Sequence, residues 1–165
     1  MRFTLIDQIV DLQPGKLITA IKSVALTEDY LRDHFPLFPV MPGVLMLEAM
    51  YQASAWLLRI TDDFSHSMVL LDEAKTVKYA GFVRPGQRLE LTSNLQKREE
   101  SLSWFRAKGI VDGEVVVSGR LVLKQFNLAD TDLGQGATDA FICRSLRDQF
   151  SALNSSTLAT VTQRA

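Results

Sequence analysis

Two titratable side chains of different type stand close together in the sequence, where a stiff loop leads into an apolar stretch. His34 opens a segment in which Pro36, Pro39 and Pro42 restrict the backbone. Glu48 lies in the apolar stretch that follows. A neutral imidazole can remove a proton from carbon, and a carboxyl group can donate a proton to a departing hydroxyl. The pair therefore has the parts for acid–base chemistry, provided that rigid elements position them.

The residue that begins the apolar stretch could supply a third group. Gly43 follows Pro42, and proline is favoured at the start of a helix because its missing N–H would have no intrahelical acceptor. The N–H groups of a first turn are unpaired and lie at the positive end of the helix dipole. The Gly43 N–H could therefore hold a carbonyl oxygen on which negative charge develops.

Each of the two titratable side chains also has a structural alternative. His34 could bond a backbone carbonyl, and Glu48 could form an ion pair with Arg59 or with a basic residue of a second chain. Arg59 follows Glu48 by eleven residues, which is roughly 16 Å along a helix. A direct pair within one helix is therefore not expected.

The elements that must position these groups can be predicted from residue patterns. A helix is predicted over 43–60, because no glycine or proline interrupts it after its first residue. It is apolar nearly all round, which indicates burial on most sides, and Glu48, Gln52 and Arg59 form one narrow polar stripe along it. Thr27 is predicted to cap a short helix before the proline-rich loop.

Alternating apolar and polar residues predict one strand before the long helix and four after it. Asp112-Gly113 between two of these segments is typical of a tight hairpin. Residues 3–9 fit either a short helix or an edge strand. The order predicts an α+β fold, in which an antiparallel meander curls around the apolar helix. The predicted strands are 16–26, 68–78, 89–97, 102–111 and 114–126.

The composition indicates one soluble domain. The chain has 165 residues, a formal net charge of −1 and one cysteine, which disfavours nucleic-acid binding and provides no intrachain disulfide. It begins without a signal-peptide pattern and contains no stretch apolar enough for a membrane span, so we expect a cytoplasmic protein. Residues 1–126 are predicted to form the domain. Residues 127–165 are predicted to form a linker, a terminal amphipathic helix from 139 to 153 and a disordered tail. Metal-ligand clusters and phosphate-type glycine loops are missing from the sequence, so no cofactor is expected.

The segment from His34 to Gln52, HFPLFPVMPGVLMLEAMYQ, closely resembles the signature of the β-hydroxyacyl–acyl-carrier-protein dehydratases of the FabZ and FabA type. Two further segments, from Val77 to Gly86 and from Val111 to Gly113, resemble later motifs of that family. The resemblance covers roughly residues 5–123. It implies a hot-dog fold, in which a sheet wraps around the long helix, and a homodimer or a trimer of dimers with active sites between subunits.

The same resemblance implies an activity and a role for each site residue. A 3-hydroxyacyl thioester on an acyl carrier protein would be dehydrated to the trans-2-enoyl thioester. His34 would remove the C2 proton, and Glu48 of the other subunit would protonate the C3 hydroxyl. The Gly43 N–H would polarise the thioester carbonyl, and Gln52 would orient Glu48. The acyl tunnel would be lined by Phe35, Met41, Val44 and Phe82.

The sequence departs from the family pattern at three places, one of which is the segment after Asn127, which has no counterpart in a minimal member of the family. Leu37 replaces the glycine that usually follows His-Phe-Pro, and Ala80-Gly81 replace a basic pair that would contact the carrier protein. Four other cations, which are Arg84, Arg88, Lys97 and Arg98, could supply that docking surface instead.

Two other functions remain open at this point. A hot-dog thioesterase could use Glu48 to activate water, although the complete motif favours dehydration. A non-catalytic subunit that binds acyl thioesters would accommodate Leu37 and Ala80-Gly81.

Overall fold

The computed structural model describes residues 3–35 and 37–154. Six strands and three α-helices make up most of this part of the chain. The strands are β1 (Gln8–Gln13), β2 (Leu17–Ser23), β3 (Met68–Tyr79), β4 (Arg88–Glu99), β5 (Leu102–Val111) and β6 (Glu114–Phe126). The helices are α1 (Asp29–Asp33), α2 (Gly43–Thr61) and α3 (Gly136–Leu153), with short 3-10 turns at Leu128–Asp130 and Leu133–Gln135.

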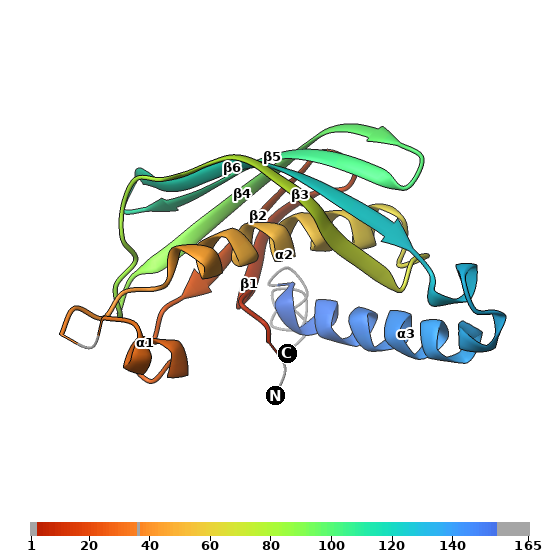
Figure 1. Ribbon diagram of the computed structural model, residues 1–165, viewed down its shortest axis with the longest axis horizontal. Coiled ribbons are helices and arrows are strands. Elements are labelled where there is room, and N and C mark those ends of the chain that lie inside the picture. The colour runs from red at the N-terminus through yellow and green to blue at the C-terminus, as the bar shows by residue number, and fades with distance from the viewer. Residues whose placement is uncertain (1–2, 36, 155–165) are drawn as a thin grey trace, which may run out of the picture.

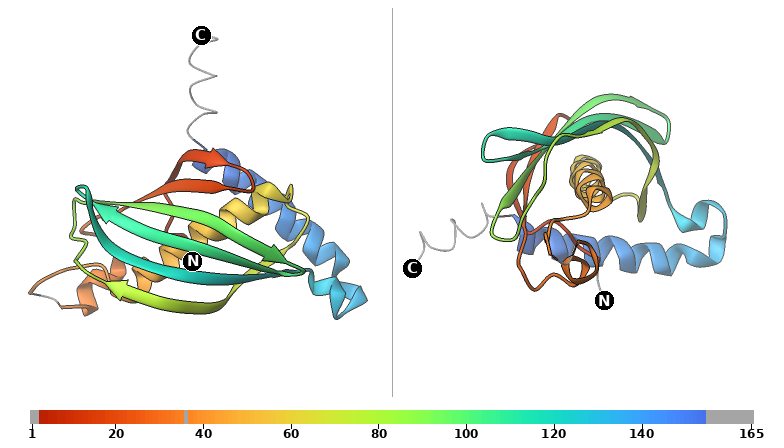
Figure 2. Two further views of the ribbon diagram at one scale, coloured as in Figure 1. Left: turned by 90° about the horizontal axis from the view of Figure 1, so that it is seen from above. Right: turned by 60° about the vertical axis from the view of Figure 1, so that its left-hand side comes forward.

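The six strands form one antiparallel sheet that curves around α2, as Figures 1 and 2 show. This arrangement confirms the predicted antiparallel sheet around a single apolar helix. The predicted meander is only partly correct, because the strand order is β1-β2-β4-β5-β6-β3. Strand β3 pairs with β6 at the far edge, and β2 takes the place beside β4. The chain reaches that far edge because α2 crosses the concave face of the sheet between β2 and β3.

Helix α2 begins at Gly43 as predicted and ends one residue beyond the predicted end. Its sheet-facing side is built from small and apolar residues, and Ala49, Ala53 and Leu57 are fully buried. The hydroxyl of Ser54 is also buried, and it bonds both the Met50 carbonyl and the Ser93 hydroxyl. The helix is thereby held against the sheet on one side, while its polar stripe faces the other way.

Local signals predicted one turn correctly and one helix cap incorrectly. Asp112 and Gly113 have φ values of 52° and 87°, as a tight hairpin turn between right-twisted strands requires. Helix α1 is capped by Glu28 rather than Thr27, and no side chain bonds its first turn. In the segment 3–9, only Gln8 and Ile9 belong to a strand.

Helix α3 lies across the side of α2 that the sheet leaves open (Figures 1 and 2). It begins three residues before the predicted start. Asp139 fixes its first turn, because the carboxylate accepts hydrogen bonds from the Leu128 and Ala129 N–H groups and from the Ser67 hydroxyl. At the other end of α3, the Phe150 ring packs on Trp56 of α2. The predicted tail falls largely at 155–165, outside the described residues.

Candidate active site

Glu48 is held by a side chain one helical turn away. The Gln52 amide nitrogen donates to Glu48 Oε1 at 2.9 Å and to the Phe3 carbonyl at 3.2 Å. The Gln52 amide oxygen accepts the Leu5 N–H at 2.9 Å. Because the oxygen must face the Leu5 donor, the nitrogen must face the carboxylate. The N-terminal segment therefore fixes the Gln52 amide, and Gln52 fixes Glu48.

A cavity of about 250 Å³ lies beside Glu48, between α2 and α3. Its α2 wall is the polar stripe that the sequence predicted, widened by the aromatic side chains of Tyr51 and Trp56. The Tyr51 hydroxyl donates to the Val69 carbonyl at 2.6 Å, and burial raises the pKa of this phenol. The sequence analysis did not select Tyr51, although its position three residues after Glu48 places it on the same helix face. The lining residues are Phe3, Thr4, Glu48, Tyr51, Gln52, Ala55, Trp56, Arg59, Leu146 and Gln149.

His34 lies outside this cavity, at the C-terminal end of α1. Its imidazole is partly buried and rests on the Phe35 ring, with 4.4 Å between the ring centroids. In the described part of the chain the imidazole has no hydrogen-bond partner, so nothing there supports the alternative of a bond to a backbone carbonyl. Phe35 itself has a φ of 49°, an uncommon value for a bulky residue.

Gly43 is the first residue of α2, and the Tyr79 ring of β3 lies directly against it. A Cβ atom built on Gly43 would be 3.1 Å from Tyr79 Cε1. The close approach explains the glycine, since any side chain would force the ring or the first helical turn to move. At this position the Gly43 N–H has no intrahelical acceptor, as anticipated.

Glu48 and Arg59 do not form an ion pair, as their helical spacing predicted. The Arg59 guanidinium instead lies over the Trp56 ring, 5.4 Å from its centroid. Glu48 and Gln52 thus face one cavity, while His34 and Gly43 of the same chain lie outside it.

A family model described as a FabA-like domain matches residues 1–120. The chain belongs to the FabA-like family. It is similar to proteins named 3-hydroxyacyl-[acyl-carrier-protein] dehydratase FabZ. The Bordetella petrii protein is 39% identical over 127 residues, covering 72% of this chain and 82% of that protein. The Magnetococcus marinus protein is 41% identical over 122 residues, covering 73% of this chain and 80% of that protein. The resemblance predicted from the His34–Gln52 segment is confirmed.

A solved structure, "The Dehydratase Heterocomplex ApeI:P from Xenorhabdus doucetiae", matches with a TM-score of 0.61 and 24% identity, covering 80% of this chain and 88% of that one. This likeness concerns the fold, and it agrees with the predicted hot-dog architecture. The family match ends at residue 120, before α3 begins at Gly136. The cavity beside Glu48 therefore combines a wall from the FabA-like domain with a wall that follows it.

The four residues predicted to line an acyl tunnel do not surround one cavity in a single FabA-like chain. Met41 belongs to the hydrophobic core, with 1% of its surface exposed. Phe35, Val44 and Phe82 are exposed near the start of α2. Leu37, which replaces the family glycine, is fully exposed. These apolar side chains therefore enlarge an exposed surface around the proline-rich loop.

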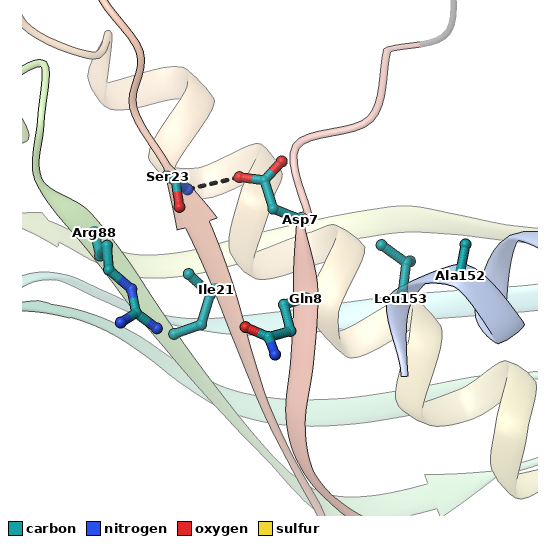
Figure 3. Close-up of a pocket in the computed structure, with 7 residues that line it drawn as sticks. All are labelled: Asp7, Gln8, Ile21, Ser23, Arg88, Ala152 and Leu153. Atoms are coloured by element: carbon teal, nitrogen blue, oxygen red, sulfur yellow. Dashed lines mark hydrogen bonds between the residues drawn. The ribbon is translucent and has the colours of Figure 1, made fainter. Parts of the chain in front are cut away.

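The four cations predicted to contact a carrier protein fall into two groups. Arg84 and Arg88 lie before or at the start of β4, and Lys97 and Arg98 lie near its end. Arg88 and Arg98 stand at opposite ends of β4, about 30 Å apart at the rise of a strand. Arg98 forms a two-point ion pair with Asp62, and Lys97 pairs with Glu99 at 2.5 Å. Arg88 lines a surface pocket of about 360 Å³ between β2, β1 and the end of α3 (Figure 3). The structure therefore does not bring the four together in one surface.

Arg84 is the predicted cation nearest the proline-rich loop. Its guanidinium lies over the Phe38 ring, 5.0 Å from the centroid, and Phe38 meets Phe82 edge to face. Residues 3–35 and 37–154 lack two other kinds of feature. They contain no group of three or more acidic, histidine or cysteine side chains arranged for a metal ion. They also contain no helix with the length and hydropathy of a membrane span.

Proposed function

We propose that the protein dehydrates 3-hydroxyacyl thioesters, carried on an acyl carrier protein, to trans-2-enoyl thioesters. The observation that carries the proposal is the Glu48 carboxyl group, which Gln52 fixes at a cavity that both of these residues of the His34–Gln52 motif line. Its similarity to proteins named 3-hydroxyacyl-[acyl-carrier-protein] dehydratase supports the same substrate and reaction.

Each residue has a defined role in the proposed elimination. The His34 imidazole takes the proton from C2, and the electrons of that C–H bond form the C2–C3 double bond. The C3–O bond breaks as the Glu48 carboxyl group protonates the departing oxygen, which leaves as water. The Gly43 N–H stabilises the charge that develops on the thioester oxygen. Transfer of the proton from imidazolium to the Glu48 carboxylate, directly or through water, restores both groups.

A complete site needs two copies of the chain. The cavity that contains Glu48 does not contain His34, so we assign His34 and Gly43 of one copy and Glu48 of a second copy to each active site. Strand β3 supports this assembly, because it is a 12-residue edge strand, and no other strand of the described residues lies beside its outer backbone groups. Pairing of two β3 strands would join two sheets into a homodimer with two equivalent sites.

The test uses the full chain and a 3-hydroxyacyl thioester on an acyl carrier protein. We expect the enoyl thioester as product, measured by mass spectrometry, and loss of turnover in His34→Ala and Glu48→Gln. A partly buried histidine outside the site, His66, provides a control in His66→Ala, which should remain active. Release of free thiol without enoyl product would identify a thioesterase. Tight binding without turnover would identify an accessory subunit, and either result would overturn the proposal.

A further inference from the structure

The cavity beside Glu48 has a cation at its far end. Glu48, Gln52, Ala55 and Arg59 follow one another along a single face of α2, at helical spacings that keep them in line. The Arg59 side chain reaches back over Trp56, as helical side chains incline toward the N-terminus. Helices α2 and α3, which form the two walls, lie next to each other (Figure 1). The cavity therefore extends from a carboxyl group to a guanidinium group.

Within the described residues, Arg59 lacks the carboxylate partner that the buried Lys22 and the more exposed Arg98 both have. Lys22 pairs with Glu28 at 2.5 Å, and Arg98 pairs with Asp62 at 2.6 Å. No carboxylate within 3–35 or 37–154 pairs with Arg59, and its buried Nε atom has no hydrogen-bond partner there. Burial accordingly lowers the pKa of Arg59. A cation withdrawn from water without an anion is unfavourable, and the Trp56 ring compensates only part of this.

The proposed function determines which part of the substrate would enter the cavity. The thioester carbonyl would lie at Gly43 of one copy, and the C3 hydroxyl would lie at Glu48 of the other. The carbons beyond C3 would therefore leave the reaction centre on the side of the copy that supplies Glu48. In that copy the cavity continues from Glu48 along α2 toward Arg59. A chain that ends in a methyl group would leave the guanidinium unpaired, whereas a terminal carboxylate would form a charge-assisted pair with it.

We propose that the cavity between α2 and α3 binds the distal end of the acyl chain, and that Arg59 selects 3-hydroxyacyl substrates whose far end carries a carboxylate. The proposal rests on the proposed dehydratase function for the direction of the chain. The separation along the helix from Glu48 to Trp56, over which the guanidinium lies, is about 12 Å. An extended chain spans that distance in roughly ten bonds. Leu146 and Gln149 of α3 complete the wall, so this selectivity would require the segment after the FabA-like domain.

The decisive experiment compares matched substrates on one acyl carrier protein. Each pair has the same number of carbons and ends in either a methyl group or a carboxylate, and the series brackets roughly ten bonds beyond C3. We expect the native chain to have at least about a tenfold higher kcat/KM for the carboxylate-ended substrate of the best length. Arg59→Met should lower kcat/KM for the carboxylate-ended substrate at least about tenfold. It should change kcat/KM for the methyl-ended substrate by less than about twofold. Arg59→Lys should give an intermediate result.

A matched control and a second readout separate the possible failures. Arg144→Met changes an exposed arginine of α3 and should leave kcat/KM for both substrates unchanged. Arg59→Met should unfold at the same temperature as the native chain or higher, because it removes an unpaired cation. The proposed selectivity would be overturned if the native chain had equal kcat/KM values for the two substrates. It would also be overturned if Arg59→Met lowered both values by the same factor.

Binding of an unreactive thioether analogue with a terminal carboxylate, measured by calorimetry, does not depend on turnover. Suppose that this analogue binds at least about tenfold more weakly to Arg59→Met, and that neither the native chain nor the variant produces enoyl thioester. The carboxylate site then stands and the dehydratase function fails. If the native chain and Arg59→Met bind it equally, the carboxylate site fails even though dehydration is observed.

Discussion

Gln52 donates a 2.9 Å hydrogen bond to Glu48 while its amide oxygen accepts the N–H of Leu5. The second bond determines the first, because an amide whose oxygen faces a donor can only present its nitrogen to the carboxylate. The orientation of the candidate acid therefore depends on the N-terminal segment that precedes β1. Gln52 acts on the proposed reaction through Glu48 and is a positioning residue.

Replacing Gln52 should separate positioning from binding. Gln52→Met keeps the side-chain length but cannot orient Glu48, so we expect kcat to fall about ten- to a hundredfold while KM changes little. The loss should appear as a change in the pH dependence of kcat, because the environment of Glu48 changes. A fall in unfolding temperature without any change in kcat or its pH profile would show that Gln52 only supports the fold.

Mixing two inactive variants should restore activity if each site combines two copies. His34→Ala and Glu48→Gln each inactivate both sites of a homodimer. A mixed dimer has one site that carries both changes and one that carries neither. Random exchange of subunits should therefore recover about a quarter of the native activity, because half of the dimers are mixed and each has one intact site. The mixture is refolded together and assayed against the separately refolded variants. If no activity returns although mixed dimers are isolated, His34 and Glu48 must act within one chain.

The sequence predicted the features that depend on near neighbours. Pro42-Gly43 marked the start of α2, and Asp112-Gly113 marked a hairpin, because both signals act through local backbone geometry. The contact between Glu48 and Gln52 follows from a four-residue spacing on a helix. The position of β3 beside β6 could not be predicted in this way, because strand pairing is decided by residues far apart in the chain.

The cavity itself also depends on distant contacts. Its second wall comes from α3, which is fixed by the bonds of Asp139 and by the packing of Phe150 on Trp56. The bond between Ser67 and Asp139 and the contact between Trp56 and Phe150 join residues more than seventy positions apart, and no periodic pattern in the sequence records them. A local reason separates the four cations that were predicted to form one docking surface. Arg88 and Arg98 share β4, but an extended strand separates its two ends.

Arg84 should contribute to carrier docking, whereas Lys97 should not. Arg84 lies over Phe38 in the proline-rich loop, and Lys97 stands near the opposite end of β4 with Glu99 as its partner. For Arg84→Glu we expect KM for a carrier-bound substrate to rise about three- to tenfold at low salt, with kcat unchanged. The native chain and Arg84→Glu should have the same KM and kcat for a short pantetheine thioester, which has no carrier protein to dock. Lys97→Glu is the matched control, and an equal rise in KM for that variant would assign the docking surface to the other end of the sheet.

A methyl group at Gly43 should disturb the proposed carbonyl site through Tyr79. In Gly43→Ala the new Cβ would lie 3.1 Å from Tyr79 Cε1, so the ring or the first turn of α2 must move. Because small displacements of a reacting group have large effects on rate, we expect kcat to fall about ten- to a hundredfold. The Tyr79 side chain is about half exposed, and Gly43→Ala with Tyr79→Ala removes the contact. The double variant should recover most of the activity, and a double variant as slow as Gly43→Ala alone would contradict the steric explanation.

Asp139 should make the attachment of α3 dependent on pH. Burial raises the pKa of its carboxyl group, but the hydrogen bonds from Ser67, Ala129 and Leu128 together lower it by more. The pKa of Asp139 therefore lies below its ordinary value. A lowered pKa means that the folded protein binds the proton more weakly than the unfolded chain does. The stabilisation is therefore complete above the unfolded pKa of about 4 and is lost as the pH falls through the lower, folded value.

Thermal unfolding of Asp139→Asn measures this dependence. At pH 7 the variant should unfold several degrees below the native chain, because its single amide oxygen can accept only one of the Leu128 and Ala129 N–H groups, while its amide nitrogen would face the other. The difference should shrink as the pH falls below about 4, because the unfolded chain then takes up a proton that the folded carboxylate still resists. Asp148→Asn changes an exposed carboxylate of the same helix and should follow the native curve. A difference between Asp139→Asn and the native chain that is constant from pH 7 to pH 3 would mean that the Asp139 charge has no part in holding α3 over the cavity.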